Sequence, residues 1–123
     1  MHYLTDRKRA VGKGAAHSGT EHFWGQAISA VGLLLLMPLF ALTFGHALGM
    51  PYEEAIAYYQ HPFPAIIAAM TLVTAMVHFR HGVQVVIEDY SRGVTKKALV
   101  VCCTALSYTV LAIGLYGLAR IAF

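Results

Sequence analysis

Three long apolar stretches, separated by two short polar linkers, dominate the sequence. Residues 27–48 and 98–119 each span 22 positions without an Asp, Glu, Lys or Arg, and residues 62–87 are interrupted by His78, Arg80 and His81. About 20 helical residues cross about 30 Å of hydrocarbon, and a helix satisfies its own backbone hydrogen bonds there. The pattern therefore predicts an all-α integral membrane protein with three transmembrane helices.

The polar residues between these stretches set the expected boundaries. We predict an amino-terminal segment at 1–22, transmembrane helices at 23–48, 62–90 and 98–120, and linkers at 49–61 and 91–97. The first linker is acidic and aromatic, and a short interfacial helix is expected around residues 53–59. Pro38 removes one backbone hydrogen bond from the first membrane helix and should bend it.

Composition and charge strengthen the membrane assignment and give it a direction. The 123 residues are 58% hydrophobic and 12% charged, whereas a soluble domain carries about 25% charged residues. Seven of the nine Lys and Arg residues lie before the first membrane helix or in the second linker, and none lies in the first linker. The rule that positive loops stay inside then places the amino terminus and the second linker in the cytoplasm.

The same residues exclude several classes of function. The basic residues form short blocks beside apolar runs, so we expect no continuous basic face that could bind nucleic acid. We expect membrane lipid to surround the protein. Cys102 and Cys103 are adjacent within an apolar run, which excludes a disulfide framework and a CxxC metal site. We see no cleavable signal and no Arg- and Ser-rich transit segment, which favours a bacterial inner membrane over a mitochondrial inner membrane.

Polar chemistry concentrates in the second half of the second membrane helix, within HFRHGVQVVIEDY. His78 precedes Tyr90 by 12 residues, about 18 Å of helix, so a Tyr90 at the interface places His78 near mid-membrane. An imidazole at that depth suits the axial coordination of an iron porphyrin, and Gly82 on the same face would leave room for a flat ring. The alternative is a histidine that simply hydrogen-bonds a neighbouring helix.

Other polar residues of this helix leave further alternatives open. His81 is three residues from His78, so either histidine could be the ligand while the other contacts a haem propionate or a water. Arg80 lies about 200° around the helix, which favours a partner-facing or snorkelling side chain over a propionate contact. Tyr90 could be an ordinary interfacial aromatic, or with Asp89 it could serve a quinone, whose carbonyls need donors and whose reduction needs protons.

The string HFRHGVQVVIEDY resembles the H-x-x-x-G-x-x-x-(V/I)-x-x-D-Y pattern of the smaller hydrophobic membrane-anchor subunit of succinate dehydrogenase, respiratory complex II. The matching residues here are His78, Gly82, Val86, Asp89 and Tyr90. The run GTEHFWGQAISAVGLLLLMPLF also resembles the start of that family's first helix. The family also has three membrane helices and a cytoplasmic amino terminus, as predicted here. The resemblance therefore covers nearly the whole chain.

The resemblance implies cofactors and partners. The family's motif histidine is an axial ligand of a haem b shared with the larger cytochrome b anchor subunit, which corresponds to His78 and its bond to the haem iron. The motif tyrosine hydrogen-bonds ubiquinone, which corresponds to Tyr90, with Asp89 nearby. His81 matches no fixed motif position and is the weaker ligand candidate. The flavoprotein and iron–sulfur subunits would be the soluble partners, and electrons would pass from succinate to quinone in the tricarboxylic acid cycle and respiratory chain.

One position departs from the family. Members commonly carry an Arg after the Gln of the first helix, a suitable partner for haem propionates, and this chain has Ala27 after Gln26. Arg80, His22 or a partner residue could substitute for that Arg. His22 and Trp24 are expected on the same side of the membrane as Tyr90 and could border a quinone pocket, although an interfacial anchor role suits Trp24 better.

The leading hypothesis is therefore an enzyme subunit with no dehydrogenase chemistry of its own, because the chain lacks iron–sulfur cysteine patterns and a dinucleotide fingerprint. The first alternative is the anchor of a fumarate reductase, which shares the architecture. A second is a small haem-free proton or solute transporter with a relay of His78, His81, Glu88 and Asp89. A third is a purely structural tether.

Overall fold

Helices account for nearly all of the computed structural model, which describes residues 5–11 and 19–123. The elements in chain order are α1 (Asp6–Val11), α2 (Thr20–Ala47), α3 (Tyr52–Gln60), α4 (Pro62–Tyr90) and α5 (Gly93–Ala122). Within these described ranges there is no strand. The predicted all-α class with three membrane helices is confirmed: α2, α4 and α5 are each long and apolar enough to cross a membrane.

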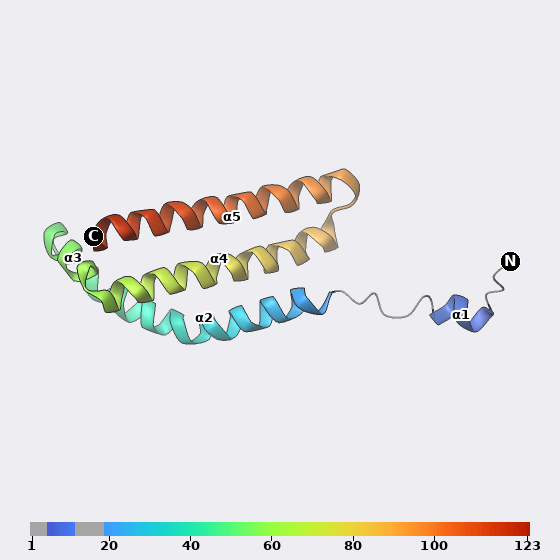
Figure 1. Cartoon of the computed structure of the whole chain (residues 1–123), viewed down its shortest axis with the longest axis horizontal. Coiled ribbons are helices and arrows are strands. Elements are labelled where there is room, and N and C mark those ends of the chain that lie inside the picture. The colour runs from blue at the N-terminus through green and yellow to red at the C-terminus, as the bar shows by residue number, and fades with distance from the viewer. Residues whose placement is uncertain (1–4, 12–18) are drawn as a thin grey trace.

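The three long helices run antiparallel to their chain neighbours, with α4 in the middle (Figure 1). α4 packs against α2 on one side and against α5 on the other. The start of α2, the end of α4 and the start of α5 therefore lie at one end of the molecule, and α3 lies at the other with the carboxyl terminus. Each long helix has 28 to 30 residues, or about 42 to 45 Å, which exceeds the hydrocarbon thickness of about 30 Å.

Short turns produce these reversals. α2 ends near Gly49, whose positive φ of 89° suits a residue without a Cβ. Only His61 separates α3 from α4, and α4 begins with Pro62, whose fixed φ and missing N–H suit the first helical position. Gly93, with φ of 62°, starts α5 two residues after Ser91. α4 has the predicted bounds, whereas α2 starts before its predicted membrane segment and α5 extends past both ends of its own, because helices can continue beyond the hydrocarbon.

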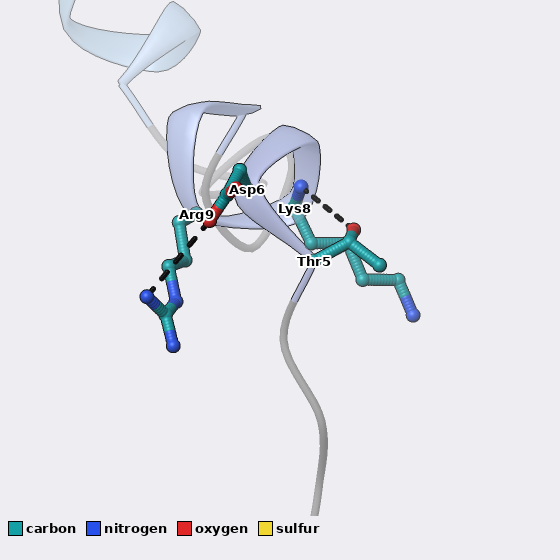
Figure 2. Close-up of polar contacts among 4 residues, drawn as sticks. All are labelled: Thr5, Asp6, Lys8 and Arg9. Atoms are coloured by element: carbon teal, nitrogen blue, oxygen red, sulfur yellow. Dashed lines mark hydrogen bonds and ion pairs between the residues drawn. The ribbon is translucent and has the colours of Figure 1, made fainter.

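α1 is a short, fully exposed helix with its own local contacts. The backbone N–H of Lys8 donates to the Thr5 hydroxyl oxygen at 3.3 Å, which satisfies one of the free amides at the helix start. Arg9 and Asp6 form an exposed ion pair at 3.9 Å (Figure 2). An exposed pair of this kind stabilises a helix by a few tenths of a kcal/mol at most.

The buried residues of the described chain are few, and nearly half of them are polar. The buried residues without a polar side chain are Leu36, Pro64, Ile67, Ala68 and Ile87, and the buried polar residues are Ser29, Thr43, Thr71 and Ser107. Each of these hydroxyls donates to a carbonyl four residues earlier, so it is satisfied within its own helix. Most large apolar side chains instead point outward, as expected for helices that meet lipid or other membrane subunits.

Candidate functional site

His78 lies on the side of α4 that faces α2. Its Nδ1 is 3.1 Å from the hydroxyl oxygen of Ser29, which is 6% exposed. The same hydroxyl oxygen lies 2.7 Å from the carbonyl oxygen of Gly25 and 2.9 Å from that of Gln26. Among the described residues, Ser29 is the one hydrogen-bond partner of the His78 ring, so the imidazole is oriented by a side chain from another helix.

His81 faces the same helix about one turn further along α4. Its ring packs edge-on against His22, with centroids 4.8 Å apart and planes at 80°. A Cβ at Gly25 would lie 2.7 Å from His81 Nε2, so the glycine makes room for this ring. The two histidines that the sequence could not separate therefore make different contacts: His78 with Ser29, and His81 with His22 and Gly25.

Unpaired polar atoms gather between α2 and α4 beside His81. His22 Nε2, Gln26 Oε1 and His81 Nδ1 are buried and lack a hydrogen-bond partner among the described residues. Gly82 faces this group, because a Cβ there would lie 3.4 Å from Gln26 Nε2. Most buried polar atoms in proteins are paired. These three atoms therefore suit a polar group supplied by a ligand or a neighbouring subunit.

Arg80 lies on the other side of α4. Its Nη1 donates to the hydroxyl oxygen of Tyr108 on α5 at 3.0 Å, and its guanidinium carbon is 5.8 Å from the centre of the Tyr108 ring. This combination of a hydrogen bond and a cation–π contact is typical of arginine. The structure therefore gives Arg80 a partner within its own chain and does not bring it to His78.

The end of α4 presents Asp89 and Tyr90 outward. Tyr90 is the last residue of the helix and is 87% exposed, and Asp89 is also exposed. Glu88 instead contacts its own chain: it accepts a hydrogen bond from Gln84 Nε2 at 3.3 Å and lies 3.5 Å from Lys96 Nζ at the start of α5. The three consecutive residues thus separate into one intramolecular contact and two side chains that are free to meet a partner or ligand.

Trp24 is exposed near the start of α2, at the end of the molecule where α4 terminates (Figure 1). It packs edge-on against Phe23, with ring centroids 5.7 Å apart. This placement suits either an aromatic residue at the membrane interface or the border of a site shared with another subunit.

The described residues contain no group of three or more His, Cys, Asp or Glu side chains that could hold a metal ion alone. Cys102 and Cys103 are free thiols, as their spacing predicts. This chain could therefore supply a single nitrogen ligand to an iron porphyrin, with the remaining coordination from the porphyrin and another chain.

Sequence reasoning missed Ser29 and Tyr108, the partners of His78 and Arg80. A clue to Ser29 exists in the sequence: it lies nine residues after the first residue of α2, about 13 Å along the helix. That depth is near the 18 Å or so expected for His78 from the end of α4. Two polar residues at similar depth on antiparallel neighbours are candidates for a pair.

Comparison with known proteins agrees with the motif. Residues 1–112 match the family described as the succinate dehydrogenase/fumarate reductase transmembrane subunit. A succinate dehydrogenase hydrophobic membrane anchor subunit from Paracoccus denitrificans is 42% identical over 120 residues, which cover 98% of this chain and 93% of the relative. No solved structure matches the chain.

These similarities confirm the family that the motif from His78 to Tyr90 indicates. Together with the three apolar helices, they fit a multi-pass protein of a bacterial inner membrane. They also place the chain in an enzyme complex without assigning it catalytic activity of its own. The chain belongs to the succinate dehydrogenase/fumarate reductase transmembrane-subunit family, as a membrane anchor.

Proposed function

We propose that this chain is the smaller membrane anchor of a succinate:quinone oxidoreductase, where it helps to bind haem b and ubiquinone. The observation that carries the proposal is the His78 imidazole, which lies inside a membrane-spanning helix and hydrogen-bonds through Nδ1 to Ser29. A polar group at that depth is costly to insert and is usually retained for a use. Membership of the anchor family makes haem ligation the use that best explains it.

The residues present fit a haem. With Nδ1 occupied by Ser29, the other nitrogen of His78 is available to an iron atom. The unpaired polar atoms of His22, Gln26 and His81 lie toward the end of α4 and can receive a propionate or its water. His78 would bind the haem iron, and the larger cytochrome b anchor subunit would help to hold the haem. A bound haem b would supply a one-electron carrier near the quinone.

Tyr90 and Asp89 are the groups that we assign to ubiquinone. A phenol can donate a hydrogen bond to a quinone carbonyl, and a neighbouring carboxylate can handle the protons that reduction consumes. Both side chains are exposed at the end of α4, where a partner subunit could complete the pocket. The distribution of Lys and Arg favours a cytoplasmic location for this end, in which case protons would come from that side.

The anchor role itself requires neighbouring subunits. The outward-facing apolar side chains of α2, α4 and α5 offer surface to lipid and to the larger anchor subunit. The flavoprotein and iron–sulfur subunits would dock at the cytoplasmic end and carry out succinate oxidation. Fumarate reduction is the second candidate, favoured by a family description that names both enzymes; the two reactions differ in redox potential and share this anchor geometry.

The test uses the complex purified from the native membrane through a tag on this chain. We expect a flavoprotein and an iron–sulfur protein to co-purify, together with the absorption bands of a haem b. A His78→Leu complex should lose or distort those bands, and the control His46→Leu, an exposed histidine at the opposite end of α2, should retain them. A colourless wild-type complex without a flavoprotein would refute the proposal and favour a haem-free transporter.

The quinone assignment has its own arm in the same experiment. Tyr90→Phe removes one hydroxyl, and the loss of one hydrogen bond of about 0.5–1.5 kcal/mol should lower succinate-to-quinone turnover roughly 2- to 12-fold. Succinate oxidation with a soluble dye should persist, because it does not need the quinone pocket. Equal losses in both assays would indicate defective assembly, and unchanged quinone turnover would remove Tyr90 from the site.

A further inference from the structure

We propose that Ser29 is a positioning residue for the haem: its hydroxyl selects the His78 tautomer that carries the proton on Nδ1 and leaves Nε2 free for the iron. This inference rests on the proposed function and adds a residue from a second helix to it. Neither the motif nor the family description assigns a role to Ser29. The position of the single hydroxyl proton of Ser29 decides which nitrogen of His78 is protonated.

The Ser29 hydroxyl has two carbonyl acceptors within its own helix. Its oxygen is 2.7 Å from the Gly25 carbonyl oxygen and 2.9 Å from the Gln26 carbonyl oxygen. A serine in a helix commonly donates its proton to the carbonyl of the preceding turn. The proton is therefore directed along α2, and the oxygen lone pairs are directed at other donors.

The contact with His78 must then run in the opposite direction. A hydroxyl that donates to a carbonyl can only accept from a third group, so Nδ1 at 3.1 Å has to carry a proton and donate it to Ser29. In a neutral imidazole the proton occupies one nitrogen only, and the other keeps its lone pair. Nε2 is thereby left as the nitrogen able to bind a metal.

The opposite tautomer is disfavoured by the same geometry. It would require Ser29 to turn its proton toward Nδ1 and give up both carbonyl contacts, while Nε2 would carry a proton and be unable to ligate. Ser29 is 6% exposed, so water has little access to compensate for the lost bonds. Two hydrogen bonds thus follow one another: His78 Nδ1 donates to the Ser29 hydroxyl oxygen, and that hydroxyl donates to the Gly25 carbonyl oxygen.

This arrangement matches a general property of metal sites. A histidine ligand usually donates its second ring N–H to a fixed acceptor, which sets the tautomer and makes the ligating nitrogen more basic. Loss of such an acceptor typically weakens metal binding about 10- to 100-fold. His81 has no such acceptor among the described residues, because its Nδ1 is buried and unpaired. The contrast favours His78 over His81 as the prepared ligand.

The test compares Ser29→Ala with a matched control, Thr43→Ala, in the purified complex. Thr43 is also a buried hydroxyl on α2 that donates to carbonyls of the preceding turn, and no hydrogen bond links it to a histidine among the described residues. We expect Ser29→Ala to raise the haem midpoint potential, because a less basic imidazole stabilises the ferric state less. Haem transfer to apomyoglobin should indicate about 10- to 100-fold weaker binding. Thr43→Ala should leave both quantities at wild-type values.

A conservative variant separates positioning from packing. Ser29→Thr keeps the hydroxyl and should retain the wild-type potential. If Ser29→Ala fails to assemble, Ser29→Cys offers a similar volume with a weaker sulfur acceptor, and the same rise in potential is expected. A wild-type potential in Ser29→Ala, or in Ser29→Cys where that variant replaces it, would overturn the role of Ser29. So would equal shifts in Ser29→Ala and Thr43→Ala. The proposed function is tested separately. If the wild-type complex contains haem and the His78→Leu complex does not, the proposed function is supported even where the role of Ser29 is overturned.

Discussion

The two sides of α4 differ in what they bury. On the α2 side, His78 hydrogen-bonds Ser29. His81 packs edge-on against His22, and Gly82 lies close to Gln26. The α5 side carries two polar contacts, one between Arg80 and Tyr108 and one between Glu88 and Lys96 at the turn. The rest of its packing is apolar.

Two open apolar cavities lie near α3, one between α4 and the end of α5 and the other reaching α2 as well. An open apolar cavity of about 390 Å³ is lined there by residues that include Pro62, Ala65, Leu115 and Ala119. A neighbouring cavity of about 310 Å³ includes Ala68, Leu72 and Gly114 in its lining. One helix can thus place polar contacts on one face and mainly apolar packing on the other. Substitutions of similar size on the two faces should then have different effects.

The largest expected difference is steric. Gly25→Ala places a Cβ against the rigid ring of His81, whereas Gly114→Ala places one against the flexible end of the Leu72 side chain. Replacing glycine with alanine stabilises either helix by about 1 kcal/mol through helix propensity. Overpacking destabilises the protein by about 1–3 kcal/mol where the neighbouring side chain cannot move. We expect Gly25→Ala to lower the melting temperature of the complex in detergent and Gly114→Ala to raise it slightly. Equal melting temperatures would remove the distinction between the two faces.

Arg80 provides a smaller and more selective effect. If Arg80 serves only the α4–α5 contact, Tyr108→Phe should keep the cation–π contact and remove one hydrogen bond worth about 1 kcal/mol. The haem absorption bands and midpoint potential should then stay at wild-type values in Tyr108→Phe and in Arg80→Met. A shifted potential in Arg80→Met alone would show that Arg80 also reaches a propionate, which would bring the α5 side of α4 into the haem site.

The smallest effect is expected at the turn between α4 and α5. Lys96→Met removes the 3.5 Å contact with Glu88, whose other side-chain partner among the described residues is Gln84. Partly exposed ion pairs contribute about 0–1 kcal/mol, so a thermal melt should show a loss of that size or less, weaker still at high salt. A loss of several kcal/mol would mean that this turn is a principal link between the two helices.

Sequence alone predicted the three membrane helices because hydropathy over about 20 residues reflects the solvent directly. It placed the third helix at residues 98–120, whereas α5 begins at Gly93. Lys96 and Lys97 are compatible with a helix outside the hydrocarbon, so charge marks the membrane boundary and not the helix boundary. The same reasoning explains why α2 starts at Thr20, three residues before the predicted segment.

The partners of the site residues were harder to predict. Spacing along α4 shows that His78 and His81 share a face, but it carries no information about which residues of another helix lie opposite. Similar depth makes Ser29 a candidate partner, but its contact with His78, and that of His22 with His81, became clear only once α2 and α4 were placed side by side. The outward residues Asp89 and Tyr90 were the easier part, because a motif at the end of a membrane helix specifies its own position.

The Ser29 contact also has a consequence for how the membrane helices find their alignment. The apolar parts of α2 and α4 would tolerate a slip of one helical turn, since one aliphatic side chain replaces another at little cost. Such a slip would set His78 opposite Gly25 or Leu33, and neither has a side-chain oxygen. A single hydroxyl in an otherwise largely apolar helix interface can therefore fix the axial register of a helix pair, much as one polar residue does in a coiled coil.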